Sequence, residues 1–162
     1  MIQPHSIPVP IFQDSDGTDY GEGMRERMYY LAAGLSAPLI VEIGTRTGNS
    51  LRIWAAACEQ NGGEVYSIDC HLPTFRGTPW VIPPRCALIV LAAERIEGWS
   101  RSINLMYIDG DHTAEALQRD LTQWWPHVAT GGPLLVHDVT NEGHYRDLIP
   151  VVTSLCRTTL LT

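Results

Sequence analysis

Short apolar runs alternate with stretches of helical periodicity along most of this chain. Five of these runs are short and rich in β-branched or other apolar residues, as buried strands of a parallel sheet are. They are residues 39–43, 64–69, 87–91, 104–108 and 134–136. The pattern therefore predicts five strands, most of which stop at a glycine or at a charged or polar residue.

The segments between these runs show the spacing of amphipathic helices. Apolar residues recur three and four positions apart over residues 24–35 and again over 114–128, where Pro126 is expected to end the helix. A third helix is predicted over 49–60, ending at Asn61-Gly62-Gly63, and a fourth over 141–155. Strands that alternate with helices in this way predict an α/β fold.

Length and composition predict one compact domain. The chain has 162 residues, of which 44% are hydrophobic. We expect residues 1–19, which are rich in Pro, Asp and Ser, to form an N-terminal arm, and 20–162 to form the domain. The stretch 71–85 holds four prolines and no helical period, so it is expected to be a loop, with Trp80 as an adenine or substrate contact or as a packed side chain.

Charge and segment composition exclude several classes of partner. The formal net charge is −7 and no basic patch is present, which argues against nucleic acid as the main partner. No apolar run is long enough to span a membrane, and no secretory signal is seen at the start. Four cysteines without a C-x-x-C spacing suit a reducing compartment, so a cytoplasmic location is expected.

The turn after the first expected strand carries the first candidate site. Its sequence from Glu42 to Gly48 follows the pattern E-x-G-x-x-x-G. A dinucleotide-binding turn would carry a third glycine, and a carboxylate there would repel a pyrophosphate, so a dehydrogenase is disfavoured. An acid at this place instead suits a ligand with a cationic end, such as the amino group of a methionine moiety. Glycines at this spacing also occur in ordinary strand–turn–helix connections.

Asp69 ends the second expected strand, 25 residues after Gly44. An acidic residue at this distance is placed to accept hydrogen bonds from ribose hydroxyls. Asp also favours turns without any ligand, so the residue has a structural alternative. Together with the Glu42 turn, the position favours a nucleoside ligand.

Acidic and histidine residues cluster after the fourth and fifth expected strands. The first cluster is Asp109, Asp111 and His112, and the second is His137 and Asp138. Because carboxyl ends of parallel strands share one edge of a sheet, these side chains can supply several ligands to one cation. Carboxylates alone suit magnesium, manganese or calcium, whereas a histidine among them shifts the expectation toward manganese, iron or zinc. The alternative is that the aspartates cap the following helices, beside Thr113 as N-cap.

Four segments together resemble a known family. They are LIVEIGTRTGNS, VYSIDCH, MYIDGDHTAEALQRDLTQWW and GGPLLVHDV, which occur in this order between residues 39 and 139. The chain resembles class I S-adenosylmethionine-dependent methyltransferases. More narrowly, it is similar to the metal-dependent O-methyltransferases that act on macrolide sugars and to cephalosporin-hydroxylase-like proteins. This resemblance implies a Rossmann-like, doubly wound, mostly parallel sheet with helices on both faces, shortened at the C-terminus.

The resemblance also implies roles for individual residues. S-adenosylmethionine would be bound by Glu42, Gly44, Thr45, Gly48 and Asp69, with Asp109 beside it. Asp109, His137 and Asp138 would hold a divalent metal, magnesium or manganese. The base would be His112 or Asp111, with His112 preferred because imidazole titrates near neutral pH. The implied reaction transfers a methyl group to a hydroxyl group of a small molecule.

Two other functions stay open at this stage. The chain could be a shortened, non-catalytic S-adenosylmethionine-binding module, or a hydroxylase-like relative with a different reaction. Only 24 residues follow Asp138, which leaves no room for the closing strands of the family. The fifth strand would then have an open edge, covered by a second copy of the chain, left as it is, or paired with residues 158–162. The segment 92–97, where the family contacts adenine, contains no distinctive residue.

Overall fold

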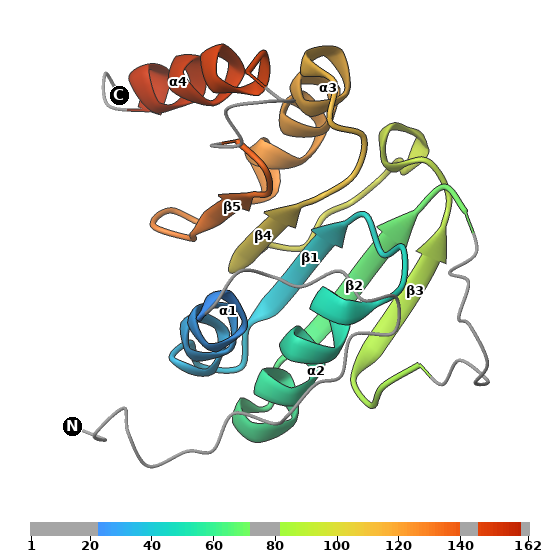
Figure 1. Ribbon diagram of the computed structural model, residues 1–162. Helices are drawn as coiled ribbons and strands as arrows, with labels where there is room; N and C mark the ends of the chain where they lie inside the picture. The colour runs from blue at the N-terminus through green and yellow to red at the C-terminus, as the bar shows by residue number, and fades with distance from the viewer. Residues whose placement is uncertain (1–22, 72–81, 140–145, 160–162) are drawn as a thin grey trace.

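A five-stranded parallel sheet forms the centre of the molecule. The computed structural model describes residues 23–71, 82–139 and 146–159 (Figure 1). The strands are β1 Leu39–Ile43, β2 Glu64–Asp69, β3 Cys86–Val90, β4 Leu105–Ile108 and β5 Leu134–Val136. They lie side by side in the order β3-β2-β1-β4-β5, and every pairing is parallel. The doubly wound Rossmann-like fold predicted from the sequence is confirmed.

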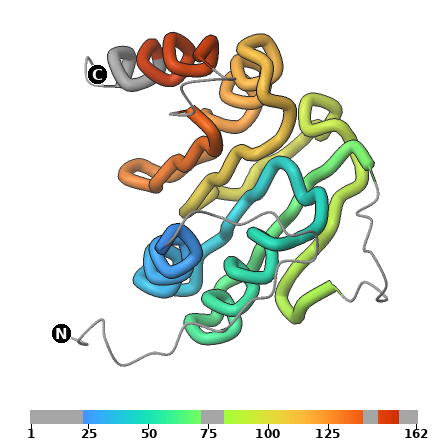
Figure 2. Tube along the Cα trace, in the orientation of Figure 1, coloured from blue at the N-terminus to red at the C-terminus, as the bar shows by residue number. Residues whose placement is uncertain are grey.

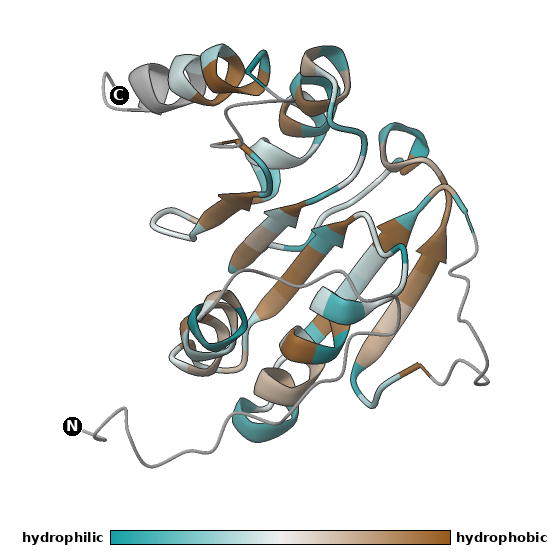
Figure 3. Cartoon of the chain, viewed as in Figure 1, coloured by the Kyte–Doolittle hydropathy of each residue, from teal (hydrophilic) through white to brown (hydrophobic). Residues whose placement is uncertain are grey.

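Helices cover both faces of this sheet. They are α1 Met24–Ala33, α2 Asn49–Asn61, α3 Ala114–Trp124 and α4 Leu148–Thr159, with 3₁₀ turns at Ala93–Arg95 and Trp125–His127. One apolar cluster joins α1 and α2 to one face, and a second joins α3 and α4 to the other. Successive residues of β4 alternate between them: Leu105 belongs to the first cluster and Met106 to the second. Figure 3 shows the apolar strands between helices that are apolar on one side.

The strand order changes direction at the centre of the sheet, between β1 and β4. From β1 the chain moves outward through β2 to β3, and it then returns to place β4 on the other side of β1 (Figure 2). The crossovers that leave β1 and β4 therefore run to opposite faces. In open α/β sheets, ligands bind in the crevice that such a switch leaves at the carboxyl ends of the strands.

Most predicted elements lie close to their expected bounds, and the last helix differs. The helix expected over 141–155 begins at Leu148 among the described residues and includes Thr158 and Thr159. Those two residues are therefore helical and do not add an edge strand, because the spacing of Leu148, Val151 and Val152 packs this segment against the second apolar cluster. Within the described residues, β5 pairs only with β4, so it is an edge strand. The predicted arm 1–19 and Trp80 lie outside the described residues.

Gly44 ends β1 at the point where the crevice begins. Its φ is +97°, a conformation that favours glycine. A Cβ atom on Gly44 would lie 2.1 Å from the backbone oxygen of Asp109, which follows β4. The ends of the two central strands thus touch each other, and only a residue without a side chain fits between them.

We predict that Gly44→Ala lowers the free energy of unfolding by about 3 kcal/mol or more, because left-handed strain adds to a backbone clash. The measurement is urea denaturation followed by circular dichroism. Gly98→Ala is the matched control, since Gly98 also has a positive φ, +70°, but nothing lies within 4 Å of the position that a Cβ atom would take there. That variant should lose only about 1 kcal/mol, the strain alone. Equal losses in the two variants would contradict the close-contact argument.

Candidate active site

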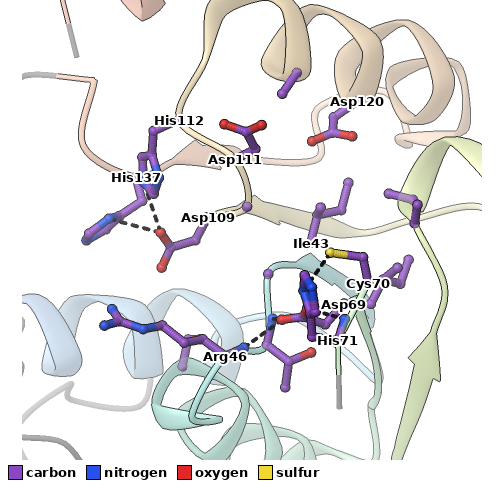
Figure 4. Close-up of a pocket in the computed structure, with 18 of the residues that line it drawn as sticks. Ile43, Arg46, Asp69, Cys70, His71, Asp109, Asp111, His112, Asp120 and His137 are labelled. Carbon is purple, nitrogen blue, oxygen red and sulfur yellow. Dashed lines mark hydrogen bonds and ion pairs between the residues drawn. The ribbon is translucent and has the colours of Figure 1, made fainter. Parts of the chain in front are cut away.

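A cavity of about 760 Å³ occupies the crevice at the carboxyl ends of β1, β2, β4 and β5 (Figure 4). This volume lies in the range of sites for small molecules and cofactors. The predicted site residues that line it are Gly44, Thr45, Asp69, Asp109, Asp111, His112, His137 and Asp138. The structure therefore brings together residues that are up to 94 positions apart in the sequence. Glu42 and Gly48 are both buried and are not among the lining residues.

Asp69 fixes the glycine turn from the neighbouring strand. Its Oδ2 accepts hydrogen bonds from the backbone N–H groups of Thr45 and Arg46 at 2.9 and 2.8 Å. Its Oδ1 accepts one from the N–H of His71 at 2.9 Å. Arg46 has a φ of +44°, and Gly48 a φ of +73° as the residue that precedes α2. The carboxylate thus holds a strained turn in place while it lines the cavity itself.

Glu42 lies under the turn, on the sheet face that α2 covers. In the strand register it stands between Ser67 of β2 and Tyr107 of β4. Its carboxylate accepts hydrogen bonds from Ser67 Oγ and, at 3.2 Å, from Trp54 Nε1. Complete burial raises the pKa of Glu42 from 4.5 to about 7, although hydrogen bonds from Ser50, Ser67 and Trp54 oppose the shift. Ser67 also bonds Thr45 Oγ1 at 2.6 Å, which connects Glu42 to the turn.

Four side chains gather at one end of the cavity. The Oδ1 atom of Asp109 lies 3.1 Å from His137 Nδ1 and 3.3 Å from His112 Nε2 (Figure 4). Asp138 Oδ2 lies 3.4 Å from the same atom of His137 and 3.5 Å from that of His112. We call Asp109, His112, His137 and Asp138 the Asp/His cluster. Asp109, His112 and His137 each offer one ligand atom within 4.8 Å of the others, as a bound metal ion requires.

The Asp/His cluster is held from behind by β4. Tyr107 donates a hydrogen bond from its hydroxyl to Asp109 Oδ2 at 3.0 Å, which leaves Oδ1 facing the two histidines. The ring of Tyr107 packs edge-to-face on Trp54, with 5.5 Å between centroids. The pKa of His137 is raised above its ordinary value, chiefly by its contact with Asp109, while burial acts in the opposite direction. Asp138 has a φ of +58°, so the backbone at the end of β5 is strained at this site.

Local hydrogen bonds at the start of α3 account for one acid of the cluster that follows β4. Asp111 Oδ1 accepts a hydrogen bond from the N–H of Thr113 at 3.1 Å, and Thr113 Oγ1 accepts one from Ala116 at 3.2 Å. The capping alternative holds for Thr113, which is confirmed as the N-cap of α3, while Asp111 supports the turn just before it. It does not apply to Asp109, whose side chain contacts Tyr107 and the two histidines.

One buried acid on the cavity wall was not predicted. Asp120 of α3 is only 7% exposed, yet it lines the cavity together with Ala116 one turn earlier. Sequence reasoning assigned the inner face of this helix to apolar residues, which Leu117 and Leu121 confirm. The sequence did contain a signal for this residue. Asp120 lies beside the apolar face of the helix and not opposite to it, so its acid was a candidate for burial.

In the part of the chain that the structure describes, no helix combines the length and the apolar composition that crossing a lipid bilayer requires.

A family model described as a methyltransferase domain matches residues 41–139, which is more than half of the chain. The match begins within β1 and ends just after Asp138, so it contains every lining residue named above.

Solved structures with the same fold are also methyltransferases. The SAH-bound methyltransferase PaMTH1 of Podospora anserina aligns with a TM-score of 0.63 and 17% identity, over 90% of this chain and 74% of its own. The O-methyltransferase TomG of Streptomyces achromogenes, in complex with SAM, aligns with a TM-score of 0.57 and 15% identity, over 86% and 69%. MycE, of the mycinamycin biosynthetic pathway, was solved with Mg, SAH and mycinamycin VI. It aligns with a TM-score of 0.54 and 20% identity, over 70% of this chain and 31% of MycE.

We predict that Glu42→Gln makes the stability of the fold less dependent on pH. The wild-type carboxyl keeps its proton up to about pH 7 when folded but loses it above 4.5 when unfolded, so stability falls as pH rises between these values. Over that window the free energy of unfolding of the wild type falls by about 3 kcal/mol. Glu42→Gln lacks this fall because its amide does not titrate. Urea denaturation at pH 5 and pH 8 measures it, with the exposed Glu59→Gln as control. A wild-type pH profile that Glu42→Gln leaves unchanged would contradict the buried, protonated carboxyl.

Proposed function

The chain belongs to the family of methyltransferase domains, and on that premise we propose that it is an S-adenosylmethionine-dependent O-methyltransferase. We further propose that it acts on a hydroxyl group of a small molecule and uses a divalent metal ion. The observation that carries this proposal is that one cavity contains both the glycine turn with Asp69 and the Asp/His cluster. A methyl donor on the turn and an acceptor at the cluster would lie next to each other.

The glycine turn and Asp69 are the proposed site for S-adenosylmethionine. The Asp69 carboxylate lines the cavity, and a carboxylate can accept more bonds than the three that Asp69 already receives. We assign its remaining capacity to the ribose hydroxyls. Gly44 and Thr45 line the same wall, whereas Gly48 starts α2 and Glu42 supports the turn from below. The acidic environment suits a cofactor that carries a sulfonium and an ammonium group.

The Asp/His cluster fits a divalent metal by its donor chemistry. Separations of 3.1 to 3.5 Å between carboxylate oxygens and imidazole nitrogens are those of ligands that share one ion. Asp109, His137 and Asp138 would hold the metal, for which the sequence predicts magnesium or manganese. When bound, a divalent metal supplies a Lewis acid that makes a nearby hydroxyl group more acidic.

His112 is the proposed base. Its Nε2 atom lies 3.3 Å from Asp109 Oδ1 and 3.5 Å from Asp138 Oδ2, and these contacts orient the ring. As the substrate oxygen attacks, the new O–CH₃ bond forms, the S–CH₃ bond breaks, and the hydroxyl proton goes to His112. The carboxylates stabilise the resulting imidazolium. Asp111, the other candidate, already accepts the N–H of Thr113 and so is the weaker choice.

A non-catalytic S-adenosylmethionine-binding module is the second candidate function. The chain spans about a third of the length of MycE and about three quarters of that of PaMTH1. The edge position of β5 also suits contact with a second copy of the chain, which would complete the sheet. Cys58, Cys70 and Cys86 are free thiols. The cytoplasmic location is a proposal from the spacing of the cysteines in the sequence.

We predict that Asp69→Asn weakens binding of S-adenosylhomocysteine, the product of the reaction, by about tenfold or more, because a charged acceptor for the ribose hydroxyls is lost. Titration calorimetry measures the affinity, and circular dichroism checks that the turn still folds. Glu59→Gln, a neutralised acid on the exposed end of α2, should bind as the wild type does. Unchanged affinity in Asp69→Asn would remove Asp69 from the cofactor site.

We predict that Asp109→Ala and His112→Ala separate metal binding from proton transfer. Asp109→Ala should lose the heat of manganese binding in calorimetry and also the methyl transfer to a panel of hydroxylated compounds. His112→Ala should keep manganese binding and lose methyl transfer, since only the base is removed. Loss of manganese binding in His112→Ala would make this residue a ligand. Methyl transfer that persists in EDTA would contradict metal dependence.

A further inference from the structure

Three consecutive residues at the end of β2 bring three different donor atoms together, apart from the Asp/His cluster. Cys70 Sγ lies 3.0 Å from His71 Nδ1, which lies 3.9 Å from Asp69 Oδ1. One ligand atom of each residue lies within 4.8 Å of the other two. Figure 4 shows the side chains of Cys70 and His71 turned toward each other beside Asp69. We call Asp69, Cys70 and His71 the β2-end group.

The local backbone explains why neighbours in the sequence converge here. In an extended strand, successive side chains point to opposite faces of the sheet, so three in a row would not meet. β2 ends at Asp69, and the chain bends at Cys70 and His71. Asp69 Oδ1 accepts the N–H of His71 at 2.9 Å, a turn that is typical of aspartate. This bond holds the bend that brings the imidazole back to the end of the strand.

The spacing of the three donor atoms fits a tetrahedral ion. Zinc binds cysteine sulfur, histidine nitrogen and carboxylate oxygen at lengths that put neighbouring ligand atoms about 3.4 to 3.6 Å apart. The observed separations of 3.0 and 3.9 Å lie on either side of this range, so small side-chain rotations bring the donors into place. The side chain of Asp69 is 14% exposed and that of His71 is 86% exposed. Cys70 is exposed as well, so water can supply a fourth ligand from the solvent side.

The β2-end group differs in donor chemistry from the Asp/His cluster. The cluster offers carboxylate oxygens and imidazole nitrogens, whereas the β2-end group adds the sulfur of Cys70. Thiolate sulfur selects zinc and similar soft ions over magnesium and manganese. β1 lies between β2 and β4, so two strand spacings of about 4.8 Å each separate the two groups. They are therefore too far apart to share one ion.

The surroundings of the β2-end group admit a cation. The Oδ2 atom of Asp69 is taken up by two N–H groups of the glycine turn, whereas Oδ1 accepts the N–H of His71 and keeps a second lone pair. The guanidinium group of Arg46 extends from the turn away from Cys70 and His71 (Figure 4). All three residues of the group line the acidic cavity, whose field attracts cations.

We propose that the β2-end group is a second metal site of this protein and that it binds zinc. The ion is held by the thiolate of Cys70, by Nδ1 of His71 and by Oδ1 of Asp69. Because Asp69 is also the proposed contact of the cofactor ribose, zinc at this site and S-adenosylmethionine exclude each other. That exclusion rests on the proposed function, whereas the metal site itself does not.

Cobalt(II) is the probe for this site, because a cobalt–thiolate bond gives a strong charge-transfer absorption in the near ultraviolet that oxygen and nitrogen ligands do not give. The wild type, kept reduced with a phosphine, should develop this band on titration with cobalt, and zinc should abolish it. Cys70→Ser should lose the band, and His71→Ala should weaken zinc binding by about tenfold or more. Both side chains are exposed, so both variants should keep the thermal midpoint of the wild type.

Two control variants assign the band to the β2-end group. Cys86→Ser removes the half-buried thiol of β3 and should keep the band. Asp109→Ala removes a proposed ligand of the Asp/His cluster and should keep it too, because that cluster contains no sulfur. Absence of the band in the wild type, or its persistence in Cys70→Ser, would overturn the proposed site.

A second measurement tests the exclusion of the cofactor. Saturating zinc should weaken the binding of S-adenosylhomocysteine to the wild type by about tenfold or more in calorimetry, but not to Cys70→Ser, which keeps the Asp/His cluster. Equal affinity of the wild type with and without zinc would overturn the exclusion, and so would an effect of zinc that persists in Cys70→Ser. A wild type that binds no S-adenosylhomocysteine at all would overturn the proposed function, while the cobalt band would still decide on the metal site.

Discussion

The contact between the ends of β1 and β4 is the constraint on which the site depends. Gly44 closes β1 with its backbone directly against that of Asp109, and no side chain fits between them. The residues just beyond this contact belong to two different chemical regions. On one side lies the turn that Asp69 holds, and on the other lies the Asp/His cluster. A wider gap between the two strands would separate a bound nucleoside from the groups that are proposed to act on its methyl group.

A row of polar side chains below this contact stiffens both regions at once. Ser67, Glu42 and Tyr107 are register neighbours on β2, β1 and β4. Ser67 bonds Thr45 of the turn, and Tyr107 bonds Asp109 of the cluster. Glu42 lies between them, capped by the indole N–H of Trp54. Burial of an acid lowers the stability of the fold. In return, this hydrogen-bonded row fixes the positions of the glycine turn and of the Asp/His cluster.

The sequence predicted the strands, the turn and the rim of the cavity because their signals are local. An apolar run followed by glycine or acid marks the end of a strand, and parallel strands bring such ends together. What it could not supply is the direction in which a side chain points at a strand end. Glu42 has the parity of Ile40, which faces α1 and α2, whereas Ile43 lines the cavity from the other face. The acid that looked like a ligand contact is therefore seen under the turn. Asp120 was not predicted for a related reason. An acid at the border of the apolar face of a helix is exposed or buried depending on the neighbouring elements, which the sequence does not specify.

The acidity of the cavity has a consequence for the direction of the proposed reaction. Outside the Asp/His cluster, whose negative charge the proposed metal ion would offset, the cavity is lined by the acidic residues Asp69, Glu94, Asp111 and Asp120 and by the guanidinium groups of Arg46 and Arg119, so negative charge prevails there. S-adenosylmethionine carries a sulfonium cation, and S-adenosylhomocysteine carries a neutral sulfur in its place. Electrostatic attraction in a site of low dielectric therefore favours the donor over the product. Transfer of the methyl group removes the charge that this attraction acts on, so in the proposed reaction the carboxylates that attract the donor would hold the demethylated product less tightly.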